Sequence, residues 1–296
     1  MEIFPFGNTY LCAKMYPVNL NVYKNMSGHS KWSKIKHKKG LNDAKKGKMF
    51  SKMGQQIMIA ARDGGGDLDA NFTLRLLVDK AKSISMPMDN VQRAIDRGSG
   101  KSGESVTIEN ATYEGFGPAK VSMIIETLTD NKNRTVSDLR TTFSDNGGGL
   151  GEAGSASWNF THKGLVVIRP AKMKKSEKYG QEDKMIFVDE EEVVMQMIEI
   201  DGVEDFRQYE ENEMDDPKEN GKYIAIYTDA RSLAHVRDSV KELGFVISSA
   251  DLVWVANTPK AKLTQEELDK MSRLIEALEE MDEVQSIWTD ADDQLN

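Results

Sequence analysis

The hydrophobic positions between residues 41 and 98 recur at helical spacing. In the first part of this segment most apolar residues lie three or four positions apart, as on one side of an amphipathic helix. These residues are Leu41, Ala44, Phe50, Met53, Ile57, Ala60 and Ala61. The glycines at positions 64–66 end this helix.

Two shorter helices follow before residue 98. The second helix has Asp69 or Asn71 as its N-cap and an apolar face made of Leu74, Leu77, Val78 and Ala81. The third begins near Pro87, a residue suited to the first helical turn, and its apolar residues are Met88, Val91 and Ile95. Gly98 ends it. The pattern therefore predicts a small three-helix domain.

Beyond residue 105 the pattern changes to mixed strands and helices. A strand at 121–128, a helix at 134–144 and an alternating strand at 155–161 form one expected β-α-β unit. A second series follows from residue 164, in the order β-α-β-β-α-β that is typical of a ferredoxin-like domain. Its expected elements are 165–168, 190–199, 206–209, 223–227, 233–243 and 245–255. The lysine-rich stretch 172–183 is expected to be a surface loop.

Two elements near the end of the chain are left over from this series. They are a long helix capped by Thr264 and a short strand at 284–288. They fit the earlier β-α-β unit, which makes the third domain an insertion into the second. We therefore predict an α+β protein with three domains. A disordered extension, residues 1–25, precedes them. The domains are a basic helical N-terminal domain at 26–104, a discontinuous α+β domain at 105–163 with 260–296, and an inserted ferredoxin-like domain at 164–259.

Positive charge is concentrated near the start of the chain. The segment from residue 26 to residue 62 has ten basic residues and a single acid, Asp43, so its net charge is +9. The whole chain has a net charge of −9, and the remainder therefore has −18. Charge asymmetry of this kind indicates a polyanionic partner.

The basic segment supplies the candidate nucleic-acid-binding residues. We expect residues 27–40 to form a flexible arm, and the helix after it to have a free lysine face. Trp32 and His37 add flat side chains that can stack on bases. The candidates are Lys31, Trp32, Lys34, Lys36, His37, Lys38, Lys39, Lys45, Lys46, Lys48 and Lys52. A merely solvated lysine face or a localisation signal is the alternative.

A second candidate lies in residues 129–135 (TDNKNRT), at a strand-to-helix junction. Asp130, Asn131 or Asn133 can cap the helix. Lys132 and Arg134, beside the free N–H groups of a helix N-terminus, can also hold a phosphate. Both interpretations are compatible with the sequence.

Several motif matches lack the context that their chemistry needs. Residues 98–103 match G-x-G-x-x-G and end in a G-K-S-like run, but they follow a helix, whereas phosphate loops follow a strand. We interpret them as a linker. Asp67, Asp69 and Asn71 open like a calcium loop, yet Phe72 and Val78 occupy the positions that need Gly and Glu. Capping is the better interpretation.

Composition narrows the class of protein further. No apolar run approaches the roughly 20 residues that span a bilayer, and a single cysteine, Cys12, excludes an internal disulfide. The histidines have no zinc-like spacing, and no nucleophile elbow is present. We therefore expect a cytoplasmic protein with no enzymatic activity, metal or cofactor. An enzyme with its site between domains is the remaining alternative.

Several motifs together resemble the YebC/PmpR family, which includes a mitochondrial translational activator of cytochrome c oxidase. The matching stretches are 28–32 (GHSKW), 35–39 (IKHKK), 43–48 (DAKKGK), 64–67 (GGGD), 113–118 (YEGFGP), 129–135 (TDNKNRT) and 147–148 (GG). The resemblance runs from Met26 to about residue 290. Residues 1–25 and the lysine-rich insert depart from it, so Met26 is the expected working start.

The resemblance implies a crescent-like protein of three domains without enzymatic activity. It also implies nucleic-acid binding, either to DNA as a transcriptional regulator or to ribosomes as a translation factor. We favour a ribosome- or RNA-associated translation factor, because no DNA-reading helix is evident. We expect it to be a monomer. A DNA-binding transcriptional regulator is the alternative.

Overall fold

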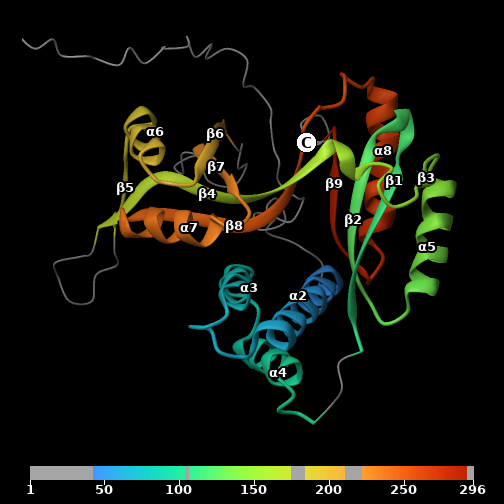
Figure 1. The fold of residues 1–296 in the computed structure, drawn as a ribbon, viewed down its shortest axis with the longest axis horizontal. Helices are drawn as coiled ribbons and strands as arrows, with labels where there is room; N and C mark the ends of the chain where they lie inside the picture. The colour runs from blue at the N-terminus through green and yellow to red at the C-terminus, as the bar shows by residue number, and fades with distance from the viewer. Residues whose placement is uncertain (1–42, 104–106, 175–183, 211–221, 292–296) are drawn as a thin grey trace, which may run out of the picture.

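The computed structural model describes residues 43–103, 107–174, 184–210 and 222–291. Figure 1 shows a helical bundle, a sheet with helices beside it, and a second sheet with its own helices. The α+β class and the three-domain organisation predicted from the sequence are confirmed.

In the described part of the N-terminal domain, three helices pack around one apolar core. They are α2 (Asp43–Gly64), α3 (Phe72–Ser83) and α4 (Met88–Gly98). Of the two expected N-caps of the second helix, Asn71 is the observed one, and its side chain accepts a hydrogen bond from the Leu74 N–H at 3.0 Å. The predicted stripe residues Met53, Ile57, Leu74, Val78, Val91 and Ile95 are all buried in the core.

Gly98 ends the third helix and also allows α4 to approach α2. A Cβ atom at this position would lie 2.1 Å from the Met58 carbonyl oxygen and 2.9 Å from the Cβ of Ala61. These are backbone and Cβ atoms that cannot rotate away. Glycine is therefore needed here for close packing as well as for helix termination.

The second domain is built on a four-stranded antiparallel sheet with the order β3-β1-β2-β9. Its strands are β1 (Glu109–Phe116), β2 (Ser122–Thr129), β3 (Gly149–Leu150) and β9 (Val284–Thr289). The helices α5 (Lys132–Asp145) and α8 (Gln265–Glu279) share its apolar core. A capping box between Thr264 and Glu267 begins α8, as the sequence predicts. Because β9 pairs with β2, the chain returns to this domain after the third one, and the predicted insertion is confirmed.

The third domain has the predicted ferredoxin-like order. Its elements are β4 (Phe160–Lys174), β5 (Lys184–Phe187), α6 (Glu190–Ile198), β6 (Val203–Glu210), β7 (Lys222–Asp229), α7 (Leu233–Glu242) and β8 (Phe245–Ala256). The antiparallel neighbours run β8-β4-β7-β6, with β5 added beside the end of β4. The helices α6 and α7 pack on one face.

Three local predictions are wrong. Met88, expected on the apolar face of the third helix, is exposed. Residues 172–174 belong to β4 and not to a loop; residues 175–183 of that insert lie outside the described part. The expected strand at 155–161 is a turn with a 3-10 helix, η2 (Ser157–Asn159), and the strand begins only at Phe160. The cause is the Glu114 carboxylate, which accepts the N–H groups of Gly154, Ala156 and Ser157 and so removes them from any strand ladder.

Candidate nucleic-acid interface

The structure describes only part of the predicted basic surface. Lys31, Trp32, Lys34, Lys36, His37, Lys38 and Lys39 lie outside the described residues. Lys45 lies in the first turn of α2, and Lys46 beside it is exposed. These two positions continue the basic segment onto the helix.

The lysine face of α2 is not free along its whole length. The ammonium group of Lys52 donates a hydrogen bond of 2.9 Å to the Glu279 carbonyl oxygen, and only 5% of the residue is exposed. Lys48 donates to the Glu280 carbonyl oxygen and lies 3.4 Å from the Asp282 carboxylate. Carbonyls at the end of a helix lack intrahelical partners, so the end of α8 is a natural acceptor for these cations. The expectation of a free lysine face is therefore wrong at Lys48 and Lys52.

Burial changes the acid–base behaviour of Lys52. Desolvation, together with the nearby charge of Lys48, lowers its pKa to about 8 from the ordinary 10.5. The acids Glu279, Asp282 and Glu283 act in the opposite direction but do not restore the ordinary value. Lys52 is therefore a docking residue between the N-terminal and second domains.

Side-chain contacts fasten the N-terminal domain to the third domain as well. The guanidinium of Arg237 on α7 lies 2.7 Å from the Asp79 carboxylate, and Lys80 lies 2.8 Å from that of Asp251. Phe72 and Leu76 of α3 pack against the core of the third domain. The helical domain is thus held by both of the other domains.

The junction at residues 129–135 is a well-built helix cap. Asn131 is the N-cap of α5, and its side chain accepts the Arg134 N–H at 3.1 Å. Arg134 pairs with Asp130 at 2.7 Å and with Glu283 at 3.1 Å, and Lys132 pairs with Glu109 at 2.6 Å. The capping interpretation is confirmed for Asn131.

These ion pairs bear on the phosphate interpretation of the same junction. The hydrogen bond from Lys132 holds the pKa of the Glu109 carboxyl below its usual value, and the same contact raises the pKa of Lys132. A hollow of about 270 Å³ lies here. A phosphate would have to displace Glu109 from Lys132, and phosphate binding by Lys132 and Arg134 stays a prediction.

The glycine-rich turn after α4 has no N–H groups to offer a phosphate. The Ser99 N–H donates to the Ile95 carbonyl oxygen, and the N–H groups of Lys101 and Ser102 donate to that of Asp96. Gly100 and Gly103 have φ of +78° and +72°, as expected in turns. Because the turn closes the end of α4, it supports the linker interpretation.

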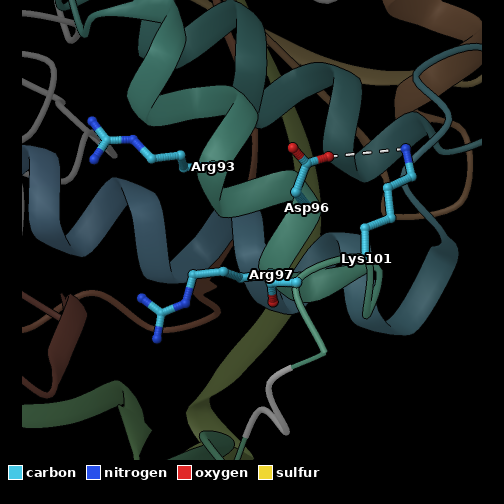
Figure 2. A pocket seen from close by; sticks show the side chains of 5 residues that line it. Arg93, Asp96, Arg97 and Lys101 are labelled. Atoms are coloured by element: carbon cyan, nitrogen blue, oxygen red, sulfur yellow. Dashed lines mark ion pairs between the residues drawn. The ribbon is translucent and has the colours of Figure 1, made fainter.

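A basic hollow on α4 is a feature that the sequence analysis did not single out. It has a volume of about 540 Å³ and is lined by Arg93, Asp96, Arg97, Lys101 and Ser102. Figure 2 shows the guanidinium groups of Arg93 and Arg97 extending to the same side, away from the Asp96–Lys101 ion pair. The four-residue spacing of the two arginines was the available signal.

The other motif matches have structural explanations. The Asn71 amide donates to the carbonyl oxygens of Ala60 and Gly65, and the Asp67 carboxylate accepts the Asp69 N–H. These residues therefore fix a turn. Within the described ranges no group of three or more His, Cys, Asp or Glu residues is placed to hold a metal ion.

Comparison with known proteins decides the family. The model of the TACO1/YebC protein N-terminal domain matches residues 30–101, and the model of the TACO1/YebC second and third domain matches residues 108–291. This chain belongs to the TACO1/YebC family.

Relatives of this TACO1/YebC protein match it over most of their length. A probable transcriptional regulatory protein of Herpetosiphon aurantiacus is 42% identical over 264 residues, which are 89% of this chain and 94% of the relative. Another of the same name from Clostridium acetobutylicum is 40% identical over 90% of this chain and 97% of its own. A crystal structure of a conserved hypothetical protein from Aquifex aeolicus has a TM-score of 0.69 and 34% identity, covering 88% of this chain and 96% of its own.

No helix in the described part of the chain is long and apolar enough to cross a membrane.

The burial of Lys52 makes the stability of this TACO1/YebC protein depend on pH. A lysine whose pKa is lowered on folding costs stability below its folded pKa, because the buried charge is disfavoured. We expect the free energy of unfolding of the wild type, relative to Lys52→Met, to rise between pH 8 and pH 10.5, by up to about 3 kcal/mol. Chemical denaturation of both proteins at a series of pH values measures this difference.

Lys46→Met is the matched control, because Lys46 lies on the same helix and is exposed. Because this variant keeps Lys52, its free energy of unfolding should rise with pH relative to Lys52→Met as that of the wild type does. A difference between wild type and Lys52→Met that is flat with pH would contradict the buried position of Lys52.

Proposed function

We propose that this protein regulates gene expression by binding nucleic acid through its basic N-terminal segment, with ribosomal RNA as the principal target. The charge of +9 on residues 26–62 against −18 on the rest of the chain supports a polyanionic partner. The relatives' name, probable transcriptional regulatory protein, supports a regulatory role. The proposed site of action is the cytoplasm, and the proposed form is a monomer without a catalytic activity.

The docking of α2 is the observation that favours RNA over DNA. A helix that reads the major groove must present one exposed face to the base edges. On α2 the face with Lys48 and Lys52 is closed by the end of α8. The remaining lysines of the segment lie at the start of α2 and before it, which suits contacts to an RNA backbone and to unpaired bases.

The arm lysines provide the test. We expect Lys36→Glu, Lys38→Glu and Lys39→Glu together to weaken co-sedimentation with ribosomes by at least about tenfold, because three phosphate contacts become repulsive. Binding of the wild type should also fall steeply as salt increases, and the triple variant should have a smaller salt dependence. Sedimentation at several salt concentrations measures both effects.

A charge-matched control separates the arm from net charge. Lys174→Glu, Lys241→Glu and Lys270→Glu change three exposed lysines elsewhere and alter the total charge equally. This variant should co-sediment like the wild type. Equal losses in both triple variants, or no ribosome association at low salt, would contradict the proposal.

The second candidate function is regulation of transcription by direct DNA binding, which the relatives' name favours. It predicts one DNA sequence preferred over competitor duplex by a factor of at least about 10³. Selection from a random duplex library would reveal such a sequence. Equal affinity for all duplexes would count against it.

A further inference from the structure

Trp158 is the most exposed large hydrophobic residue in the described part of the chain. It lies in η2, between β3 and β4, and 72% of its surface is accessible. No other large hydrophobic residue of the second domain is exposed among the residues that the structure describes. A single exposed tryptophan in this domain differs from the contiguous apolar patch that protein partners recognise.

The loop that carries Trp158 is held on both sides. Before it, the Glu114 carboxylate accepts hydrogen bonds from the N–H groups of Gly154, Ala156 and Ser157, at 2.8, 2.6 and 2.7 Å. After it, the Asn159 side chain exchanges two hydrogen bonds of 3.0 Å with the backbone of Thr258. Ala156 and Asn159 are buried, so Trp158 faces solvent from a fixed backbone. A preorganised loop lowers the entropy cost of binding.

The indole ring has a flat surface to offer but no spare donor. Its Nε1–H already donates to the Ser155 carbonyl oxygen at 3.0 Å. What remains exposed is therefore the π surface, which binds by stacking. Stacking on an aromatic side chain is how single-stranded nucleic acids are held with little sequence preference.

Positive charge lies on the segments joined to this loop. The segment clamped by Asn159 continues to Lys260, whose ammonium group donates to the Lys120 carbonyl oxygen at 3.3 Å. Lys120 and Lys262 are exposed. Ala119 and Lys120 have φ of +56° and +58°, a left-handed conformation that is uncommon outside glycine and that often marks binding sites. A polyanion is thus the complementary partner.

We propose that Trp158 stacks on an unpaired base of single-stranded RNA, while Lys120, Lys260 and Lys262 face its phosphates. This inference rests on the proposed function and adds a second contact, on a different domain from the basic arm. The arm provides charge, and Trp158 distinguishes unpaired from paired strands because a base inside a duplex has no open face.

Binding of a 12-nucleotide oligouridine and of a 12-base-pair RNA duplex tests the inference. We expect Trp158→Ala to weaken oligouridine binding on the order of tenfold, with the salt dependence and the duplex affinity unchanged. Trp158→Phe retains an aromatic face and should stay within about threefold of the wild type. The emission difference between wild type and Trp158→Phe reports Trp158 itself and should decrease when oligouridine is added.

The outcomes separate this inference from the proposed function. RNA binding that depends on the arm lysines, with an unchanged affinity for Trp158→Ala and unchanged Trp158 emission, would overturn the inference alone. An equal loss for oligouridine and duplex would overturn stacking on an unpaired base. If the wild type binds neither RNA nor ribosomes, both the inference and the proposed function fail. Equal melting temperatures for the wild type and Trp158→Ala should confirm that the exposed side chain is not needed for folding.

Discussion

Gly98→Ala is expected to destabilise the N-terminal domain by about 3 kcal/mol. The new methyl group would lie 2.1 Å from the Met58 carbonyl oxygen and 2.9 Å from the Cβ of Ala61. Because the neighbours are backbone and Cβ atoms, α2 and α4 must separate and loosen the core that they share. Hydrogen exchange of the amides in α2 and α4 measures the loss, which corresponds to protection lowered on the order of a hundredfold.

Gly47→Ala is the matched control with the opposite expected sign. Gly47 is exposed in α2, and a Cβ atom there meets nothing within 4 Å. Alanine at a helical glycine of this kind stabilises by about 0.5–1 kcal/mol. A Gly98→Ala protein as protected as the wild type would mean that the two helices do not pack this closely.

Glu114→Gln is expected to lower the free energy of unfolding of the second domain by about 2–4 kcal/mol. The carboxylate accepts three N–H groups with two oxygens, whereas an amide has one accepting oxygen. At least one N–H group of the loop loses its partner, and an NH₂ group takes the place of an acceptor. Denaturation followed by the hydrogen exchange of residues 154–157 measures the effect.

The effect of Glu114→Gln also depends on pH. Burial alone would raise the pKa of Glu114, but the N–H donors of Gly154, Ala156 and Ser157 outweigh it and hold the pKa below 4.5. A carboxyl group whose pKa is lowered on folding stabilises the protein at every pH above the pKa that it has in the unfolded chain. This contribution disappears as the pH falls through the pKa of the folded state. The difference between wild type and variant should therefore shrink below pH 4.5.

Glu109→Gln is the control on the same strand. Its partner Lys132 is exposed, and an ion pair at such a solvent-screened site contributes little to stability. Comparable losses for Glu109→Gln and Glu114→Gln would argue against a special function of Glu114 in holding the loop. Hydrogen exchange of the amides at residues 154–157 should be faster in Glu114→Gln than in Glu109→Gln, because Glu114 accepts N–H groups of this loop.

Much of the architecture follows from local patterns. The apolar stripe with Met53 and Ile57 predicted α2, the Thr264 cap predicted α8, and the order of elements predicted the ferredoxin-like domain. These predictions succeed because periodicity and capping act over a few residues. The strand β1 had no such signal, since most of its residues are polar or only partly buried.

The features of the candidate site also divide into those with a local sequence signal and those without one. The sequence alone determined the charge asymmetry, the cap at Asn131 and the family resemblance, because each depends on composition or on neighbouring residues. The tertiary structure decided that Lys52 is buried against a carbonyl 227 residues away and that Glu114 turns an expected strand into a loop presenting Trp158. These outcomes depend on which distant segments meet, and hydrogen-bond acceptors supplied by a distant segment leave no trace in the local pattern of hydrophobic and polar residues.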